Sequence, residues 1–413
     1  MVMKICFLNY HGNSGGAAWA ALRLFRAIRA KQDKDIDCHF YAVDPGTAPD
    51  VETIATPMKR QILYREQQIL WKLYGLERST NPTAHIFNVI RNGLLKRILS
   101  LNPDIVHLHS IVGEMLSLGE IAELAKQTIV VWTLHDCWPF TGSEQHMQLG
   151  STRYIQGYTD KNKEHSGIDF DRILFQRKEH LWRDLPIHFI APSHWIGNCL
   201  AQSKLWKNAR CTVIGNTYDP AIFHPADQNT ARKRLNLPLE KKLLGFGASD
   251  LSNPNKGGAE LQEVLQRLPR TDWELVTAGN GELPLPGLPV HALGKITDQG
   301  KLADFYRSCN LFLSTSKYDN LPNMVLESMA CGTPVAAFAN GGIPDLVRPD
   351  TGLPIKGTAA ELAESISLAT LPQLSQLGAL AQHHITAHYQ PDWIAEQHIN
   401  LYRSLLAFQG NRQ

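Results

Sequence analysis

Residues 311–347, LFLSTSKYDNLPNMVLESMACGTPVAAFANGGIPDLV, decide the fold that the sequence predicts. Residues 311–313 are an apolar run of strand length between turn-forming residues. Asp319 or Asn320 can then cap the N-terminus of a helix, and Pro322 suits its first turn. This half of the stretch therefore predicts a buried strand followed by a short helix.

The second half of the stretch ends that helix and begins another strand. Gly332 is typical of a residue just beyond a helix C-terminus, and Pro334 cannot continue the helix. Residues 335–339 predict the next strand, and Gly341-Gly342 predict a loop that opens a second short helix. The order predicts a parallel βαβ unit with its loops at the carboxyl ends of the strands.

Two carboxylates lie at the two ends of the predicted helix. Asp319 marks its start, and Glu327 follows eight residues later. The amides of a helix N-terminus suit an anionic or polyhydroxyl ligand, and carboxylates accept hydrogen bonds from sugar hydroxyls. The pair therefore predicts a site for a ligand with two sugar rings. The alternative is a capping acid and an unrelated, solvated glutamate.

The whole pattern resembles the donor-site signature of the GT-B glycosyltransferases of family 4, which retain anomeric configuration. That signature is an acid, seven residues, a Glu and a run similar to AMACGxPV, and here it is Asp319, Glu327 and SMACGTPV. The chain departs from it in having Asp as the first acid and Asn320-Leu321-Pro322 in place of the usual GFGL.

Composition narrows the class of protein. A chain of 413 residues with 43% hydrophobic residues predicts two or three well-packed domains. A net charge of +2 gives no reason to expect nucleic acid. Seven cysteines without a CxxC pair argue against disulfides or structural zinc and favour a reducing compartment. The sequence predicts no signal peptide and no transmembrane segment, so we expect a cytoplasmic, soluble or peripheral protein.

A glycine-rich turn follows the first predicted strand. Residues 4–9 predict that strand, residues 11–18 are HGNSGGAA, and residues 19–30 predict a helix. A glycine loop before a helix lets a ligand approach backbone amides, although simple strand-to-helix packing explains it equally well. By the resemblance, Gly15 and Gly16 would face the donor phosphates and the acceptor.

Residues 57–100 carry eight basic and two acidic side chains, with apolar and aromatic residues between them at roughly helical spacing. A basic amphipathic helix with aromatics suits an anionic membrane surface. The alternative is an ordinary packed helix with a basic polar face.

Histidines end two of the predicted strands. His107 and His109 close the strand of residues 103–109, and His135 follows the strand of residues 130–134. Together with Asp136 they raise the question of a metal, but the paired spacing of a zincin is absent. By the resemblance, the imidazole of His135 lies beside the reacting carbon of the donor. We therefore assign His135 a role in orienting the sugar.

Residues 138–178 lose periodicity and predict a long functional loop over the acceptor. Some family members carry clustered cysteines here. This chain has only Cys137, which argues against a loop held by a metal.

A second α/β domain begins at residues 243–247. Lys256 precedes Gly257-Gly258 and a well-patterned helix, where an ammonium can meet a phosphate; a solvated lysine is the alternative. The family also places an Arg after the preceding strand, but Ala248 and Ser249 occupy its place.

The resemblance implies the α/β GT-B fold, in which two Rossmann-like domains face a cleft. We expect residues 1–220 to form the acceptor-side domain and residues 221–390 the nucleotide-sugar-binding domain. The amphipathic helix within residues 391–413 would cross back to the first domain.

The predicted enzyme is a hexosyltransferase that moves a sugar from a nucleotide sugar to a glycan or lipid-linked acceptor, with cell-surface polysaccharide synthesis as its setting. Lys256 would balance charge on the leaving diphosphate. Asp319 with the amides of Asn320 and Leu321 would bind the transferred sugar, and Glu327 the ribose. We predict three catalytic residues (His135, Asp319, Lys256), no metal and no other cofactor.

Three alternatives remain at this stage. A glycoside phosphorylase of the same fold would release a free sugar phosphate, and a carbohydrate-binding scaffold would not react at all. A GT-A enzyme would use a D-x-D triplet at Asp33–Asp35 or Asp169–Asp171 to bind a metal.

Overall fold

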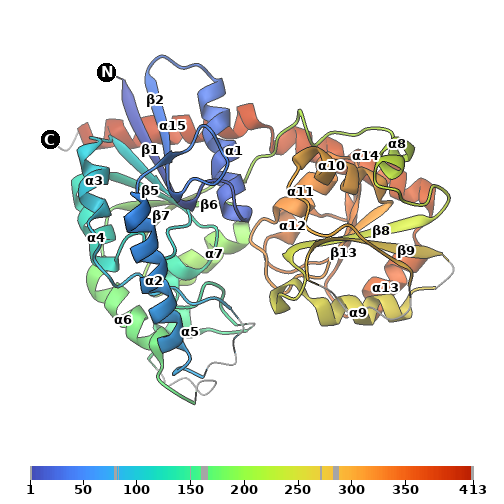
Figure 1. Cartoon of the computed structure of the whole chain (residues 1–413), viewed down its shortest axis with the longest axis horizontal. Coiled ribbons are helices and arrows are strands. Elements are labelled where there is room, and N and C mark those ends of the chain that lie inside the picture. Colours follow the sequence, from blue (N-terminus) through green and yellow to red (C-terminus); the bar gives the residue numbers. More distant parts are fainter. Residues whose placement is uncertain are drawn as a thin grey trace. The chain divides into compact units, whose positions relative to one another are not determined.

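The computed structural model describes residues 2–78, 81, 83–148, 150–159, 166–269, 272–281 and 288–410. The chain forms two compact units (Figure 1). Unit 1 comprises Met1–Gly215 and Asp392–Gln413, and unit 2 comprises Asn216–Pro391. The predicted domain boundaries lie between residues 220 and 221 and between residues 390 and 391.

Unit 1 contains a seven-stranded parallel sheet in the order β3-β2-β1-β4-β5-β6-β7. Its strands are β1 (Met3–His11), β2 (Ile36–Asp44), β3 (Glu52–Thr53), β4 (Ile105–Leu108), β5 (Ile129–Thr133), β6 (Ile187–Ala191) and β7 (Arg210–Val213). Its helices are α1 (Gly16–Ala30), α2 (Pro57–Tyr74), α3 (Leu94–Ser100), α4 (Leu118–Gln127), α5 (Arg153–Gln156), α6 (Phe170–Trp182), α7 (His194–Gln202) and α15 (Pro391–Gly410), with a 3₁₀ turn η1 (Trp138–Phe140).

Unit 2 contains a six-stranded parallel sheet in the order β10-β9-β8-β11-β12-β13. Its strands are β8 (Lys242–Asp250), β9 (Trp273–Asn280), β10 (Val290–Ala292), β11 (Leu311–Ser314), β12 (Val335–Phe338) and β13 (Gly352–Ile355). Its helices are α8 (Gln228–Arg234), α9 (Gly258–Arg267), α10 (Gln299–Ser308), α11 (Asn323–Ala330), α12 (Ile343–Leu346), α13 (Ala359–Leu368) and α14 (Leu371–His388), with a 3₁₀ turn η2 (Pro254–Lys256). The predicted strand–helix–strand–helix order of residues 311–347 is confirmed by β11, α11, β12 and α12.

The central strands of each sheet are buried on both faces, and their successive residues point to opposite sides. In β1, Leu8 packs into the core beneath α3, α4 and α6, whereas Phe7 packs into the core beneath α1 and α15. In β11 of unit 2, Phe312 faces α10 and α11, whereas Leu313 faces α9 and α13. This two-sided burial explains why the strands read as continuous apolar runs.

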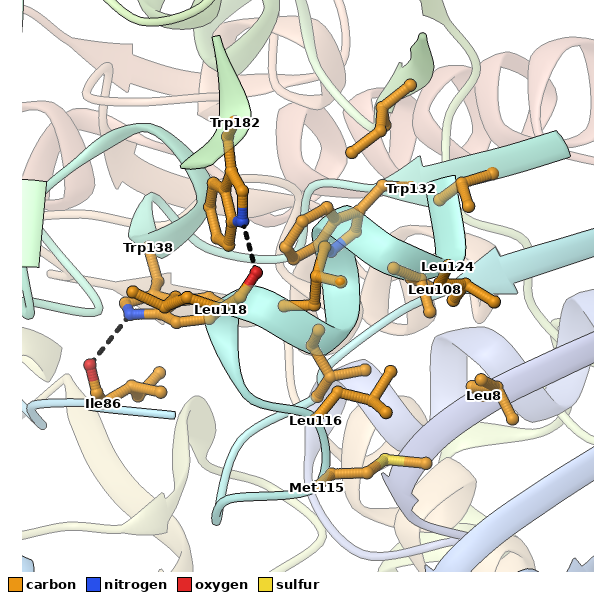
Figure 2. Packing of buried hydrophobic residues seen from close by; sticks show 14 of the residues in the cluster. Leu8, Ile86, Leu108, Met115, Leu116, Leu118, Leu124, Trp132, Trp138 and Trp182 are labelled. Carbon is orange, nitrogen blue, oxygen red and sulfur yellow. Dashed lines mark hydrogen bonds between the residues drawn. The ribbon is translucent and has the colours of Figure 1, made fainter. Parts of the chain in front are cut away.

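Three tryptophans form the centre of one core of unit 1 (Figure 2). Trp132, Trp138 and Trp182 come from β5, η1 and α6, and their ring centroids lie 5.8–6.0 Å apart. The indole N–H of Trp138 donates to the carbonyl of Ile86 at 2.9 Å, and that of Trp182 to the carbonyl of Leu118 at 2.8 Å. Trp138, the first residue of the expected loop 138–178, is therefore packed in the core. The described part of that loop contains η1, α5 and the start of α6, so it is partly helical.

The last helix belongs to unit 1. Ile394, Ile399 and Tyr402 of α15 share a core with the residues of β1. The Tyr402 hydroxyl also lies 2.7 Å from Nδ1 of the fully buried His107. The helix thus packs on one face of the first sheet, although all the strands of that sheet precede unit 2 in the sequence.

Residues 57–100 form two helices rather than one, and residues 79, 80 and 82 lie outside the described residues. In α2 only Leu63 is fully buried, and most of the apolar side chains of that helix are exposed. The exposed ones are Met58, Ile62, Tyr64, Ile69, Trp71 and Leu73. Leu70 and Tyr74 are partly buried against the same core as Leu63, so α2 combines one packed side with several exposed apolar side chains.

Candidate active site

The loop after β8 holds Lys256 at the carboxyl end of the second sheet. Lys256 ends η2, and Gly257 follows with a φ of +72°, a conformation that glycine adopts readily. A Cβ atom at Gly257 would lie 2.0 Å from the carbonyl oxygen of Thr315. The Thr315 hydroxyl in turn donates to the carbonyls of Lys256 and Gly257 at 3.0 and 2.9 Å. The lysine loop therefore rests directly on the end of β11.

Lys256 forms an ion pair with Asp319. Its Nζ lies 2.8 Å from Oδ1 and 3.0 Å from Oδ2 of Asp319, and both side chains are half-buried. The Asp319 carbonyl accepts from the amide of Gly342 at 2.9 Å, and Gly341 packs against it with a φ of +59°. The structure thus brings together two predicted catalytic residues from the loops that follow β8 and β11, and the loop after β12 supports Asp319.

The helix after Asp319 begins later than predicted. Pro322 is the N-cap of α11 and Asn323 is its first residue, so Asp319 lies in the preceding turn. The predicted capping role of Asp319 or Asn320 is wrong, because Pro322 itself provides the extended residue before the first helical turn. The carbonyl of the buried Leu321 accepts from the side-chain amide of Asn216 at 3.2 Å.

Glu327 is buried in the middle of α11 and is not a solvated surface residue. Only 4% of its surface is exposed, and Oε2 accepts a hydrogen bond from the hydroxyl of Tyr306 at 2.7 Å. Tyr306 is itself fully buried on α10. The hydrogen bond from Tyr306 fixes the direction in which this carboxylate faces.

The glycine loop of unit 1 lies beside a cavity of about 380 Å³. Gly15 has a φ of +85° and precedes α1, which begins at Gly16. No described atom lies within 4 Å of a Cβ placed on Gly15. Asn9, Ser110 and Trp71 also line the cavity. Open glycine backbone next to polar and aromatic side chains is suited to a polar ligand.

His135 follows β5 and is half-buried. Burial lowers its pKa to about 4, so the imidazole is uncharged at neutral pH. Its Nε2 lies 2.9 Å from Nδ1 of His109. His107 is bonded on both sides, by Tyr402 and by the Thr133 hydroxyl at 2.7 Å, and is a structural residue.

One group of described side chains is close enough to share a metal ion, and its member His85 lines the same cavity as Gly15 and Gly16. Glu77, His85 and Asp171 are buried, and Nδ1 of His85 is 3.5 and 3.7 Å from the two carboxylates. Oδ1 of Asp171 already accepts from the backbone amides of Ser143 and Glu144. The histidines near Asp136 form no such group within the described ranges.

Sequence reasoning missed Tyr306, Thr315 and His109 as supports of the site. Asn320, whose backbone amide is predicted to bind the transferred sugar, lies between Asp319 and Leu321 before α11. Tyr306 had no separate signal in the sequence, because an aromatic residue in an amphipathic helix reads as core.

Comparison with known protein families decides the class. Residues 14–222, about half of the chain, match the model described as Glycosyltransferase Family 4. The chain belongs to glycosyltransferase family 4. Residues 241–369 also match the model described as Glycosyl transferases group 1, so both units of this family 4 enzyme are covered.

Relatives and solved structures span almost the whole family 4 chain. WcaC of Escherichia coli (strain K12), whose name assigns it to colanic acid biosynthesis as a glycosyl transferase, is 24% identical over 98% of this chain and 100% of its own length. Sucrose-phosphate synthase from Thermosynechococcus elongatus has a TM-score of 0.70 at 19% identity, with 98% of this chain and 99% of that chain covered. Anabaena HepE in complex with UDP-glucose has a TM-score of 0.65 at 18% identity, with 97% and 100% covered.

These similarities confirm the predicted GT-B fold, and the family confirms that the protein is a glycosyltransferase. The GT-A alternative is wrong. Asp169 of its second D-x-D triplet caps α6, and Asp171 is buried within unit 1. No helix in the part of the chain that the structure describes combines the length and apolarity needed to cross a membrane.

Proposed function

We propose that this enzyme transfers a hexose, with retention of anomeric configuration, from a nucleotide sugar to a glycan or lipid-linked acceptor in cell-surface polysaccharide synthesis. The observation that carries the proposal is the pairing of Lys256 with Asp319 at the carboxyl end of the second sheet, which is where ligands bind in open α/β folds. Glu327 follows Asp319 on α11 and is held by Tyr306. The names of WcaC and of the HepE complex with UDP-glucose support the glycan product and the nucleotide-sugar donor.

In this proposal the ammonium of Lys256 stabilises negative charge on the leaving diphosphate. Two of its three N–H groups point to Asp319, which leaves one for a phosphate oxygen. Each carboxylate oxygen of Asp319 keeps a lone pair for a hydroxyl of the transferred sugar. Lys256 thereby orients Asp319. The backbone amides of Asn320 and Leu321 bind hydroxyls of the same transferred sugar.

Glu327 binds the ribose hydroxyls, and Gly15 and Gly16 face the donor phosphates and the acceptor. His135 orients the transferred sugar and is not a general base, which agrees with its low pKa. The leaving phosphate deprotonates the acceptor on the same face. The reaction needs no metal, because a lysine and backbone amides provide the positive charge.

We also propose that α2 contacts an anionic membrane surface from the cytoplasmic side. Its exposed apolar and aromatic side chains stand beside the basic Lys59, Arg60, Arg65 and Lys72. Trp71 of the same helix lines the cavity next to the glycine loop. This helix would keep the enzyme at the surface from which a lipid-linked acceptor reaches the cavity.

The test begins with a panel of nucleotide sugars, UDP-sugars first, scored by thermal stabilisation, since a ligand of the folded state raises apparent stability. The stabilising donor is then used in transfer assays with glycan and lipid-linked acceptors. An α-linked donor should give an α-linked product in the anomeric proton coupling. An inverted product would overturn the retaining assignment, and release of sugar phosphate with inorganic phosphate would indicate a phosphorylase.

The same assay tests His135. His135→Ala should lower kcat far more than it weakens nucleotide binding, because the proposed partner of the imidazole is the transferred sugar. Binding of the nucleotide alone, which lacks that sugar, is the control. An undiminished rate would remove His135 from the site.

A further inference from the structure

Unit 1 contains a stack of four histidines in its described residues. His107 lies 5.9 Å from His398 and 4.2 Å from His109, and His109 lies 5.2 Å from His135, all between ring centroids. The stack runs from α15 through the end of β4 to His135, two residues beyond the end of β5. Phe7 also stacks on His109, with 5.2 Å between the ring centroids.

The contact between His109 and His135 is a hydrogen bond between two neutral rings. Burial lowers the pKa of both, so neither carries a charge at neutral pH. Nδ1 of His109 lies 2.9 Å from Nε2 of His135, and a hydrogen bond needs one proton between them. There are therefore two arrangements, and they differ in which ring is the donor.

The other nitrogen of His109 distinguishes the two arrangements. Its Nε2 is buried and has no hydrogen-bond partner among the described residues. If His135 were the donor, this Nε2 would carry a buried N–H with no acceptor. If His109 is the donor, Nε2 is only an unused lone pair. Buried N–H groups without an acceptor are the rarer case in folded proteins.

We propose that His109 is a positioning residue that donates its Nδ1–H to Nε2 of His135 and so fixes the proton of His135 on Nδ1. The assignment rests on geometry, and its consequence for transfer rests on the function proposed above. With Nε2 occupied, His135 presents only a neutral N–H donor. Such a donor holds an oxygen of the transferred sugar and cannot take a proton from the acceptor.

The tautomer is measured directly by nitrogen NMR. Long-range ¹⁵N–¹H correlations of the deuterated full chain, labelled in histidine, distinguish protonated from unprotonated ring nitrogens. His135→Ala identifies the His135 signals by their loss. The expected result is a protonated Nδ1 and an unprotonated Nε2 in His135. The opposite pattern overturns the proposal whether or not the protein transfers sugar.

Variants of His109 test the cause. His109→Phe keeps a ring in the stack but removes the donor, and should shift His135 toward the other tautomer and lower kcat roughly 3- to 10-fold, the range for one neutral hydrogen bond. His109→Asn places an amide N–H near the lost Nδ1–H and should restore both. His398→Phe, which alters the stack without touching His135, is the matched control and should change neither.

Several results would overturn the role of His109. These are an unchanged His135 tautomer in His109→Phe, no recovery in His109→Asn, or an equal loss of kcat in His398→Phe. If His109→Phe does not fold, the tautomer of His135 in the wild type still decides the assignment, because it is measured without a substitution at His109. If His135 has the expected tautomer but no assay detects sugar transfer, only the proposed function is overturned.

Discussion

Lys256 and Asp319, 63 positions apart in the sequence, are joined by two short contacts of 2.8 and 3.0 Å between one ammonium and both oxygens of one carboxylate. The two side chains therefore act as a unit. Substitution of either one removes the partner that orients the other, so their effects on transfer are coupled.

Single and double variants of this pair should be strongly non-additive. Lys256→Ala should lower kcat by roughly 10- to 150-fold, the range for a hydrogen bond to a charged group, and should also raise the donor KM because Asp319 loses its orientation. The Lys256→Ala/Asp319→Ala double variant should be little worse than the poorer single variant. Steady-state kinetics give all three values. Lys317→Ala, which removes a nearby lysine paired with Glu260 at 3.0 Å, is the control. Additive losses would contradict the coupling.

Glu327 and Tyr306 should affect donor binding rather than chemistry. Glu327→Gln should mainly raise the donor KM, since ribose changes little between ground and transition states. Tyr306→Phe keeps the buried ring and removes only the hydroxyl that bonds Glu327, so it should raise KM in the same direction by about 3- to 10-fold. A fall in kcat at unchanged KM in either variant would show that Glu327 acts on the reacting sugar.

Transfer should survive removal of divalent cations. The rate with excess chelator should equal the rate with added Mg²⁺ or Mn²⁺, because the proposed counter-charge is Lys256. Melting curves should be recorded in the same samples, since the buried Glu77, His85 and Asp171 could respond to metal through stability alone. Lost activity at unchanged melting temperature, recovered with Mn²⁺, would contradict metal-independent transfer.

The basic side chains of α2 should control membrane binding. Each basic residue near an anionic surface contributes about 1 kcal/mol, and salt weakens the effect. Flotation with anionic liposomes should therefore fall sharply when Lys59, Arg60, Arg65 and Lys72 are replaced by Gln. The matched control replaces four exposed basic residues of unit 1 outside α2, which are Lys126, Arg183, Lys204 and Lys207. Equal flotation of both variants would show that α2 is not the contact.

The histidine stack should make the enzyme sensitive to acid. Burial lowers the pKa of His398 from 6.5 to about 4, so the unfolded chain binds a proton in this window that the folded chain does not. The free energy of unfolding should thus fall as the pH falls from 6.5 to 4, by up to about 1.4 kcal/mol per pH unit for each such histidine. Denaturant titrations at pH 7.5 and 5.0 measure this loss. The loss of unfolding free energy should be smaller in His398→Phe. An equal loss in that variant would show that the lowered pKa of His398 is not its cause.

The elements of the sheets could be predicted because buried parallel strands are short apolar runs between turn residues. The family signature at Asp319 and Glu327 likewise located the predicted donor site. The pairing of Lys256 with Asp319 could not be predicted, because it depends on how the loops of Gly257 and Gly341 pack at the carboxyl end of the second sheet. The start of α11 was misplaced because an Asp or Asn is the commoner cap and Pro322 was assigned to the first turn.

The exposure of the apolar side chains of α2 could not be predicted from the sequence either. Its interleaved basic and apolar residues predicted an amphipathic helix, but periodicity alone does not say which apolar side chains find a partner within the unit. Only Leu63 does so completely. The bond from His109 to His135 was also outside the reach of sequence, since it joins the ends of two neighbouring strands through side chains alone.

The placement of α15 in unit 1 has a consequence for the order of folding during synthesis. Asn216–Pro391 is one continuous segment, so unit 2 has all its strands and helices as soon as that segment leaves the ribosome. Unit 1 is translated first, yet the part of its sheet that α15 covers stays exposed until Ile399 and Tyr402 emerge after unit 2. The apolar residues beneath α15 are therefore exposed throughout translation of unit 2, when a nascent chain is most open to chaperones and to aggregation.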